Sequence, residues 1–284
     1  MLAAAAATLV SIGTPVLAQA TFERIKSRGQ INIGYRPAAP PFSMEDSAGK
    51  PTGYAVEFCS AIAAELGPVT GGVQQIKYIP VAVDQRVRLL REGSIDMLCD
   101  SFTIAEDRRA QVEYSAPIFY DQVQVMVRTK DKISTLDQLN GESVSVINTT
   151  TAGRAVDSYN ASNGSKWKIS RAVGADAAFG QLQLGWVKGY ARDGVLLANQ
   201  KRAMPNASDF EILPTPLSSE PIGIGLRRGD QAMKTLSDSV VVTAMKNGAM
   251  DSWYTKYFLS ATPSAQPLNI PMSARLREQI QAAK

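Results

Sequence analysis

Two hydroxyl residues and an arginine lie close together in one short segment and could hold a carboxylate between them. They are Ser101, Thr103 and Arg108. An alternating run at 94–98 precedes them and predicts a strand that ends here, where a helix-starting turn leaves backbone N–H groups unpaired. The hydroxyls add donors, and Arg108 can close the cluster with a bidentate contact. Alternatively, Thr103 caps a helix in a capping box with Glu106, and Arg108 is a solvated surface residue.

A second polar turn follows a predicted strand further along the chain. The alternation of Ser143 to Ile147 predicts the strand, and Thr150 and Thr151 stand at the start of the helix that we expect after it. Free N–H groups at a helix N-terminus bind anions and other polar acceptors. The sequence therefore predicts a second group of donors that could face the first.

The chain contains no histidine, and this excludes several kinds of catalytic and metal site. A Ser-His-Asp triad, a Cys-His dyad and a His-ligated zinc are all impossible. Two cysteines alone do not build a structural zinc site, and no glycine motif for nucleotide phosphates is present. We expect no metal and no cofactor, so an enzyme would have to use carboxylates, lysine or arginine.

The two cysteines could form one disulfide. Cys59 lies in a segment, 54–66, whose apolar residues recur at helical spacing, and Cys99 ends the strand predicted before Ser101. A helix packed on a neighbouring strand could bring the two sulfurs together, and in an exported chain a bridge is then the expected state. It would stabilise the fold by about 3–4 kcal/mol. Free buried thiols are the alternative.

The N-terminal residues 1–20 are typical of a cleaved signal peptide. They carry no charge and end in Ala18-Gln19-Ala20, although the usual positive start is missing. A buried N-terminal helix is the alternative. Cleavage would leave 264 of the 284 residues, enough for two lobes, and would place the protein in the periplasm. The net charge is +4 and the pI near 9.0, but basic and acidic residues are interspersed, so we expect no nucleic-acid partner.

Strand and helix patterns alternate in the first third of the chain, which predicts a parallel sheet with ligand contacts at the carboxyl ends of its strands. A second set of such patterns begins at Ser143. The segment Pro214 to Pro221 is rich in proline and serine and indicates a return of the chain to the first sheet. We expect lobe one to comprise residues 21–124 and 222–284, lobe two residues 129–217, and the hinge crossings residues 125–128 and 218–221.

Landmarks along nearly the whole mature chain resemble those of the polar amino-acid-binding proteins that feed bacterial ABC importers, the extracellular solute-binding proteins of family 3. The landmarks are Gly34, Pro41-Phe42, Gly53-Tyr54, Gly93-Ser94-Ile95-Asp96, Tyr114-Ser115-Ala116-Pro117, Asn247-Gly248 and Trp253-Tyr254. The resemblance implies a type II periplasmic-binding-protein fold, in which two α/β lobes joined by a two-segment hinge close on an L-amino acid. A proline-containing tail after Thr262 resembles the glutamate/aspartate subgroup.

The resemblance also implies ligand contacts at particular residues. Ser101, Thr103 and Arg108 would hold the α-carboxylate, with Thr150 and Thr151 facing them from lobe two. Asp193 would receive the α-ammonium, unless it only caps the following helix. Arg36 matches the position from which glutamate/aspartate binders reach the side-chain carboxylate, unless it is a surface arginine. Arg86 also fits the acidic-ligand subgroup, unless it is a solvated residue of a surface helix.

Two positions depart from the family pattern. Ala39 stands where many members have an aromatic residue that stacks on the ligand, and Ala175 stands where the glutamate/aspartate subgroup has a histidine. Arg192 could replace that histidine, but on an alternating strand it would face away from its neighbour Asp193. We expect an acidic or amide amino acid as the ligand.

The resemblance implies a monomeric protein with a membrane permease of an ABC importer as its partner. The alternative is an enzyme on the same scaffold, similar to cyclohexadienyl or arogenate dehydratases, which would need a general acid beside the leaving hydroxyl. The carboxylates expected near the cleft are Glu57, Asp100 and Asp193. We expect binding rather than catalysis.

Overall fold

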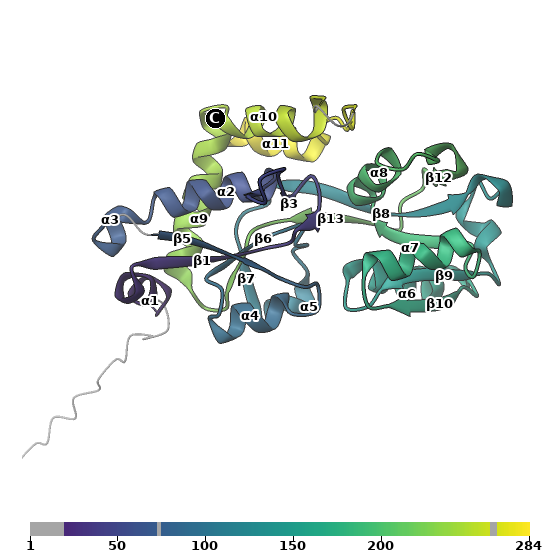
Figure 1. Cartoon of the computed structure of the whole chain (residues 1–284), viewed down its shortest axis with the longest axis horizontal. Helices are drawn as coiled ribbons and strands as arrows, with labels where there is room; N and C mark the ends of the chain where they lie inside the picture. Colours follow the sequence, from purple (N-terminus) through teal and green to yellow (C-terminus); the bar gives the residue numbers. More distant parts are fainter. Residues whose placement is uncertain (1–19, 73–74, 262–265) are drawn as a thin grey trace, which may run out of the picture.

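The computed structural model describes residues 20–72, 75–261 and 266–284, which form two α/β lobes (Figure 1). The expected signal peptide lies outside the described residues, except that the first helix begins at its last residue, Ala20. Each lobe has its own sheet and its own covering helices. The prediction of a two-lobe α/β fold is confirmed.

Lobe one is built on a five-stranded sheet in the order β5-β1-β6-β14-β7. β1, β5 and β6 are parallel, whereas β14 is antiparallel to both of its neighbours. The strands are β1 (Gln30–Tyr35), β5 (Gln75–Pro80), β6 (Met97–Cys99), β7 (Val112–Tyr114) and β14 (Gly225–Arg227). Tyr35 is opposite Cys99 in the register of β1 and β6, so the next residues, Arg36 and Asp100, leave the sheet side by side.

Helices from the first part of the chain and from its C-terminal part complete lobe one, some on the sheet and some on other helices. They are α1 (Ala20–Arg28), α2 (Tyr54–Ala64), α3 (Gly67–Thr70), α4 (Arg86–Glu92), α5 (Glu106–Arg109), α9 (Gln231–Lys246), α10 (Ala249–Tyr254), the π-helical turn Thr255–Leu259 and α11 (Ala274–Ala283). Tyr254 and Phe258 are 1% and 0% exposed and pack edge-on against Tyr54 of α2. These two aromatic residues, which are spaced as on one face of a helix, are therefore part of the core of lobe one.

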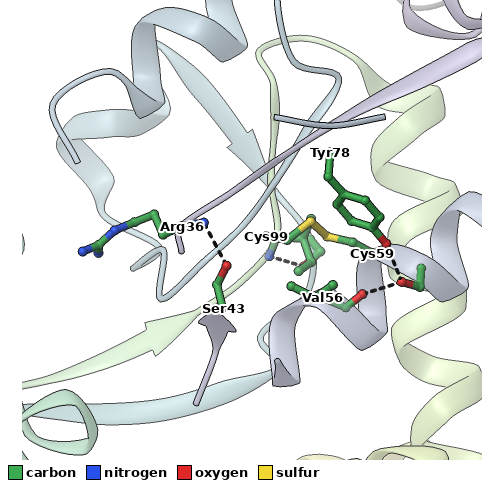
Figure 2. Close-up of a disulfide and its surroundings, with 9 residues drawn as sticks. Arg36, Ser43, Val56, Cys59, Tyr78 and Cys99 are labelled. Carbon is green, nitrogen blue, oxygen red and sulfur yellow. Dashed lines mark hydrogen bonds between the residues drawn. A yellow bond between two sulfur atoms is a disulfide. The ribbon is translucent and has the colours of Figure 1, made fainter. Parts of the chain in front are cut away.

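A small antiparallel sheet of β2 (Ala38–Ala39), β3 (Ser43–Glu45) and β4 (Pro51–Thr52) lies beside the end of β1. It supports the segment that carries Arg36, because the Arg36 backbone N–H donates to the Ser43 hydroxyl at 2.8 Å (Figure 2). Ala39 is fully buried in β2.

The disulfide predicted between Cys59 and Cys99 is confirmed, and it joins α2 to the end of β6 (Figure 2). Their Cα atoms lie 6.2 Å apart, and both residues are fully buried in the core of lobe one. The bridge is next to the segment that begins at Asp100. It therefore fixes the strand end from which the hydroxyl cluster of Ser101 and Thr103 starts.

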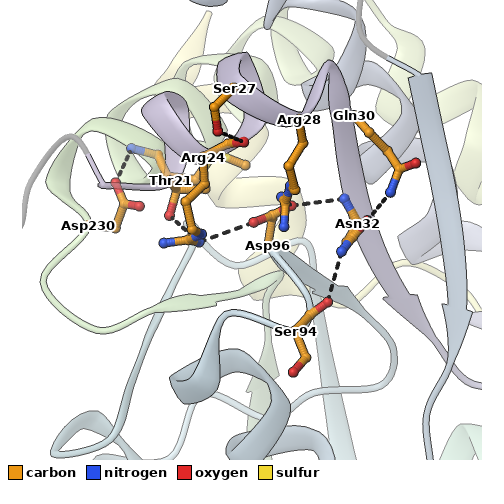
Figure 3. Close-up of polar contacts among 10 residues, drawn as sticks. Thr21, Arg24, Ser27, Arg28, Gln30, Asn32, Ser94, Asp96 and Asp230 are labelled. Carbon is orange, nitrogen blue, oxygen red and sulfur yellow. Dashed lines mark hydrogen bonds and ion pairs between the residues drawn. The ribbon is translucent and has the colours of Figure 1, made fainter.

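The fully buried Asp96 ties α1 to the loop before β6 (Figure 3). Its carboxylate accepts from Arg24 at 3.1 Å, from Arg28, and from the backbone N–H of Asn32 at 2.8 Å. A buried carboxylate needs such partners, because burial without them would make its ionised form very unfavourable.

Lobe two contains a sheet in the order β10-β9-β11-β8-β12, and β13 also pairs with β8. The strands are β8 (Phe119–Arg128), β9 (Ser143–Ile147), β10 (Lys168–Ala172), β11 (Gly189–Asp193), β12 (Phe210–Ile212) and β13 (Ser218–Ile222). The helices are α6 (Thr151–Asn163), α7 (Ala175–Leu184) and α8 (Gly194–Arg202), with short 3-10 turns at Thr129–Asp131, Leu136–Leu139 and Ala207–Asp209. The strand predicted at 143–147 is confirmed.

Two antiparallel strands, β8 and β13, connect the lobes (Figure 1). Residues 125–128, which the sequence assigned to a hinge crossing, pair with β11 and β12 inside the sheet of lobe two. Val125 and Val127 are fully buried in its core. The two-stranded stretch between the lobes is instead 119–122 of β8 with 219–222 of β13. β8 is one continuous strand, so its apolar alternation gives no sign of where it leaves the first lobe.

Candidate functional site

A cavity between the lobes brings together residues from both. Lobe one contributes Arg36, Arg86, Ser101, Thr103 and Arg108, and lobe two contributes Ile147, Thr150, Thr151, Ala152, Ala191, Arg192, Asp193 and Leu196. Every residue that the sequence selected for a ligand site is in this set. The parallel strands explain the convergence, because the carboxyl ends of β1 and β6 face those of β9 and β11.

Thr103 is held at the hinge and does not cap a helix. α5 begins at Glu106 with Ala105 in the cap position, whereas Thr103 forms an isolated β-bridge with Ile222 of β13. Its hydroxyl donates to Glu220 at 2.8 Å and lies 3.3 Å from the hydroxyl of Thr151 in lobe two. The capping-box alternative is therefore wrong, and Thr103 touches both lobes.

Arg108 is buried rather than solvated, with 7% of its surface exposed. Its guanidinium lies 5.3 Å from the centre of the Phe102 ring and donates to the carbonyl of Thr149 in lobe two at 3.0 Å. Burial, together with the nearby Arg86, lowers its pKa to about 10, so it stays positively charged at neutral pH. A buried guanidinium without a carboxylate bonded to it is a ready partner for a bound anion.

The start of α6 provides the donors of lobe two. Thr150 occupies the cap position, but its hydroxyl donates back to the carbonyl of Ile147 at 2.7 Å rather than to the helix. Thr151 begins the helix, is largely buried, and points its hydroxyl towards Thr103. The first N–H groups of α6 are therefore free of a side-chain cap and face the cavity with Thr151.

Asp193 ends β11 and stands immediately before α8, yet its side chain makes no capping hydrogen bond to that helix. Burial, and then the neighbouring Glu220, raises the pKa of Asp193 to about 6. The next residue is Gly194, where any side chain would collide with Gln124 of β8. Asp193 is thus a hydrogen-bond acceptor that lines the cavity. A cationic partner would stabilise its ionised form.

Arg36 and Arg86 share one counter-ion beside the cavity. Asp100, which is fully buried, accepts from Arg86 at 2.8 Å and lies 3.6 Å from Arg36. Burial alone would raise the pKa of Asp100, but the two arginines and the Ser101 N–H hold it below its usual value. Arg36 has 11% of its side chain exposed, so it is not a surface arginine.

Arg192 lines the same cavity as Asp193, contrary to the expectation from strand alternation. The chain turns from β11 into α8 at Asp193, so the two side chains are not held to opposite faces there. Arg192 is 7% exposed and donates only weakly to Gln200, at 3.3 Å, while its Nε is buried without a partner. It therefore has donors to spare for a ligand.

Two hinge carboxylates were not found from the sequence. Asp121 of β8 and Glu220 of β13 are directly opposite each other in the register of the connecting strands, and both are buried. Burial, and then the nearby Asp193, raises the pKa of Asp121 well above its usual value. No local motif marks either residue, because their proximity depends on pairing between segments about a hundred positions apart.

Other expected positions lie outside the cavity. Glu57 does not face the cleft, because its carboxylate accepts from Lys256 and from Tyr257 within lobe one, at 2.6 and 2.8 Å. Ala175 does not line the cavity, but it lines an adjoining groove that shares Arg36 and Arg192 with it. The carboxylates at the cleft are therefore Asp193, with Asp100 and Glu220 behind the lining.

Within the described residues, no group of three or more histidine, cysteine, aspartate or glutamate side chains is placed to hold a metal ion. The helices of residues 20–72, 75–261 and 266–284 are also too short or too polar to cross a bilayer.

Comparison with known sequences agrees with the landmarks and the fold. The family profile of bacterial extracellular solute-binding proteins, family 3, matches residues 31–260. The chain belongs to this family.

Individual relatives of this family-3 protein differ in the ligand that their names give. The glutamate/aspartate import solute-binding protein of Salmonella typhimurium is 28% identical over 95% of this chain and 88% of its own length. The L-glutamate/L-aspartate-binding protein of Pseudomonas aeruginosa is 29% identical over 95% and 91%. The structure of an ancestral arginine-binding protein bound to arginine has a TM-score of 0.71 and 28% identity, covering 81% of this chain and 99% of the other. Membership of the family therefore does not by itself decide the charge of the ligand.

Proposed function

We propose that this protein is the periplasmic substrate-binding component of an amino-acid ABC importer and that its ligand is an acidic L-amino acid, glutamate or aspartate. The observation that carries the proposal is the arrangement of charge in the inter-lobe cavity. One cavity presents Arg108 with hydroxyl donors, Asp193, and Arg36 with Arg86. These three sets of groups match the three charged groups of an acidic amino acid.

The contacts assign each ligand group to a different part of the site. Ser101, Thr103 and Arg108 would bind the α-carboxylate, with Thr151 and the start of α6 closing over it from lobe two. Asp193 would accept from the α-ammonium. Arg36, Arg86 and Arg192 would reach the side-chain carboxylate, which takes bidentate contacts from guanidinium groups.

The net charge of the site favours an acidic ligand over a neutral or cationic one. Four arginines and one aspartate line the cavity, and two further carboxylates, Asp100 and Glu220, are bonded to lining residues from behind. With all seven groups ionised, their net charge is +1. A glutamate or aspartate carries −1 and would neutralise the site, whereas an arginine ligand would leave like charges unpaired in a buried place.

Binding is coupled to lobe closure because one ligand would satisfy donors and acceptors on both lobes. A ligand shifts the balance between open and closed forms by its difference in affinity for the two. Export to the periplasm through a cleaved signal peptide, function as a monomer and delivery to a membrane permease belong to the same proposal. The uncharged start of the chain supports the export, and the names of the relatives support the delivery to a permease.

A thermal-shift screen over the twenty common amino acids tests the proposal. We expect glutamate or aspartate to raise the midpoint of unfolding most, since ligand at 100 times its dissociation constant adds about 2.7 kcal/mol. Arginine and leucine should give no shift at the same concentration. A larger shift with a neutral or basic amino acid would overturn the assignment of the ligand.

Incubation with prephenate and with arogenate tests the enzymatic alternative. Asp193, with its raised pKa of about 6, is the one cavity-lining carboxyl of the described residues that could act as a general acid. We expect neither compound to be turned over, because the proposal gives Asp193 to the ligand ammonium. Formation of phenylpyruvate or phenylalanine by the purified protein, lost in Asp193→Asn, would establish an enzyme instead.

A further inference from the structure

Asp100 is the most completely buried charged group around the cavity, and it does not line the cavity itself. One carboxylate oxygen accepts from Arg86 at 2.8 Å. The other accepts from the backbone N–H of Ser101 at 2.7 Å and lies 3.6 Å from Arg36. A single carboxylate thus contacts two arginines that we assign to the ligand side chain, and also Ser101, which we assign to the α-carboxylate.

Three arginines lie close together around Asp100. The pKa of Arg36 is lowered by burial and by the nearby Arg86 and Arg192, while Asp100 acts in the opposite direction. Without Asp100, the net charge of the seven groups would rise from +1 to +2. Charges in a buried site are screened little by salt or water, so one carboxylate there changes the preference for ligand charge.

We propose that Asp100 is a specificity-determining residue that sets the net charge of the preferred ligand at −1. Asp100 offsets part of the positive charge of Arg36 and Arg86, and it does not touch the ligand itself. The inference rests on the proposed function, because it takes an amino acid as the occupant of the cavity. It predicts that loss of the carboxylate shifts the preference of the site towards ligands of net charge −2.

Asp100→Asn tests this, because asparagine keeps the size of the side chain and an oxygen acceptor but removes the charge. The probes are L-glutamate, of net charge −1, and O-phospho-L-serine, whose phosphate makes its net charge close to −2 at pH 8. Calorimetric titration of each protein with both probes gives a ratio of affinities. We expect the ratio to shift by about tenfold or more towards phosphoserine in the variant.

The ratio of the affinities for phosphoserine and glutamate separates an effect of charge from a change in structure. Loosening of Arg36 and Arg86 would weaken both probes together and leave the ratio unchanged. Asp96→Asn is the matched control, since Asp96 is also fully buried, also contacts two arginines, and lies outside the cavity (Figure 3). We expect this control to have the ratio of the wild type, whatever its stability.

A ratio in Asp100→Asn that is unchanged, or shifted towards glutamate, would overturn the inference while leaving the proposed function intact. If the wild type binds no common amino acid, the proposed function itself fails. If Asp100→Asn does not fold, Asp100→Ser is measured instead, since it also removes the charge and leaves a smaller polar side chain. Its ratio of affinities should shift towards phosphoserine as well, and an unchanged ratio would overturn the inference.

Discussion

At the scale of residues, the cavity is marked by guanidinium groups that have more donors than the protein itself uses. Arg108 donates to a backbone carbonyl, and Arg192 has a buried Nε without a partner. Buried donors without acceptors cost free energy, which a bound ligand can recover. The side chains are therefore arranged for an occupant rather than for the stability of the empty protein.

Arg108→Ala should weaken binding of every amino acid, because each carries an α-carboxylate. Removing one partner of a buried charged pair costs about 2–5 kcal/mol, mostly as faster dissociation. The fold should survive, since the guanidinium forms no ion pair with any residue that the structure describes. Calorimetry on the variant measures the loss, and affinity within twofold of the wild type would remove Arg108 from the site.

Arg36→Met should weaken binding of acidic amino acids more than binding of other amino acids. Methionine keeps the length and apolar stem but removes a charge-assisted hydrogen bond, which should cost an acidic ligand about 1.5–3 kcal/mol. An aliphatic amino acid should lose little affinity. Arg88→Met is a suitable control, since Arg88 is half exposed on α4 and pairs only with Glu92. If all affinities fall together in Arg36→Met, Arg36 shapes the cleft and does not read the ligand side chain.

Binding should depend on pH through Asp193, whose pKa of about 6 lies above its usual value because of burial and Glu220. Below about pH 6 the free protein holds a proton there, and a bound ammonium favours the ionised carboxylate. Affinity should therefore be level above about pH 7 and fall by up to about tenfold per pH unit below pH 6. Titrations between about pH 5 and 8 measure this, and Asp193→Asn should lack the slope. An affinity of the wild type that does not change with pH would contradict the role given to Asp193.

The site could be predicted from the sequence where its residues are neighbours along the chain, and not elsewhere. Ser101, Thr103 and Arg108 share one short segment, so their types and spacing indicated an anion site. Glu220 and Asp100 are defined by contacts with distant residues, and each looks unremarkable in its own segment. Arg192 was misjudged because alternation was applied up to the last residue of the strand, Asp193, where the chain turns into α8.

At the scale of elements, β6 carries the site because it is fixed on both sides. It is parallel to β1, and its last residue, Cys99, is bonded to α2. The strand Ser143–Ile147 and the helix within 54–66 were predictable from periodicity, whereas the short strands β2, β3 and β4 were not predicted. The hinge was not predictable, since β8 runs unbroken through it and only its change of pairing partner, from β13 to β11 and β12, marks the boundary.

Removal of the disulfide should lower stability by about 4 kcal/mol in the chain-entropy estimate, because Cys59 and Cys99 are 40 residues apart. Chemical denaturation of the double variant Cys59→Ser, Cys99→Ser measures the change. Alkylation of denatured, unreduced wild type followed by intact-mass measurement should find no free thiol. Two alkylated cysteines in protein exported to an oxidising compartment would show that the bridge does not form.

At the scale of the whole molecule, direct contacts hold the lobes together around the cavity. Thr103 meets Thr151, Arg108 meets the carbonyl of Thr149, and Arg154 pairs with Asp107 at 3.3 Å. The last pair is partly exposed and is expected to contribute less than about 1 kcal/mol. An occupant that bonds to both lobes would add to these contacts and so favour the closed arrangement.

The most direct test of the central claim is a crystal structure of the protein with L-glutamate. We expect one glutamate between the lobes, with its α-carboxylate on Arg108 and Ser101 and its ammonium on Asp193. The side-chain carboxylate should contact Arg36 and Arg86. A glutamate bound in the reverse orientation, or one that contacts a single lobe, would contradict the assignment of these residues and the coupling of binding to closure.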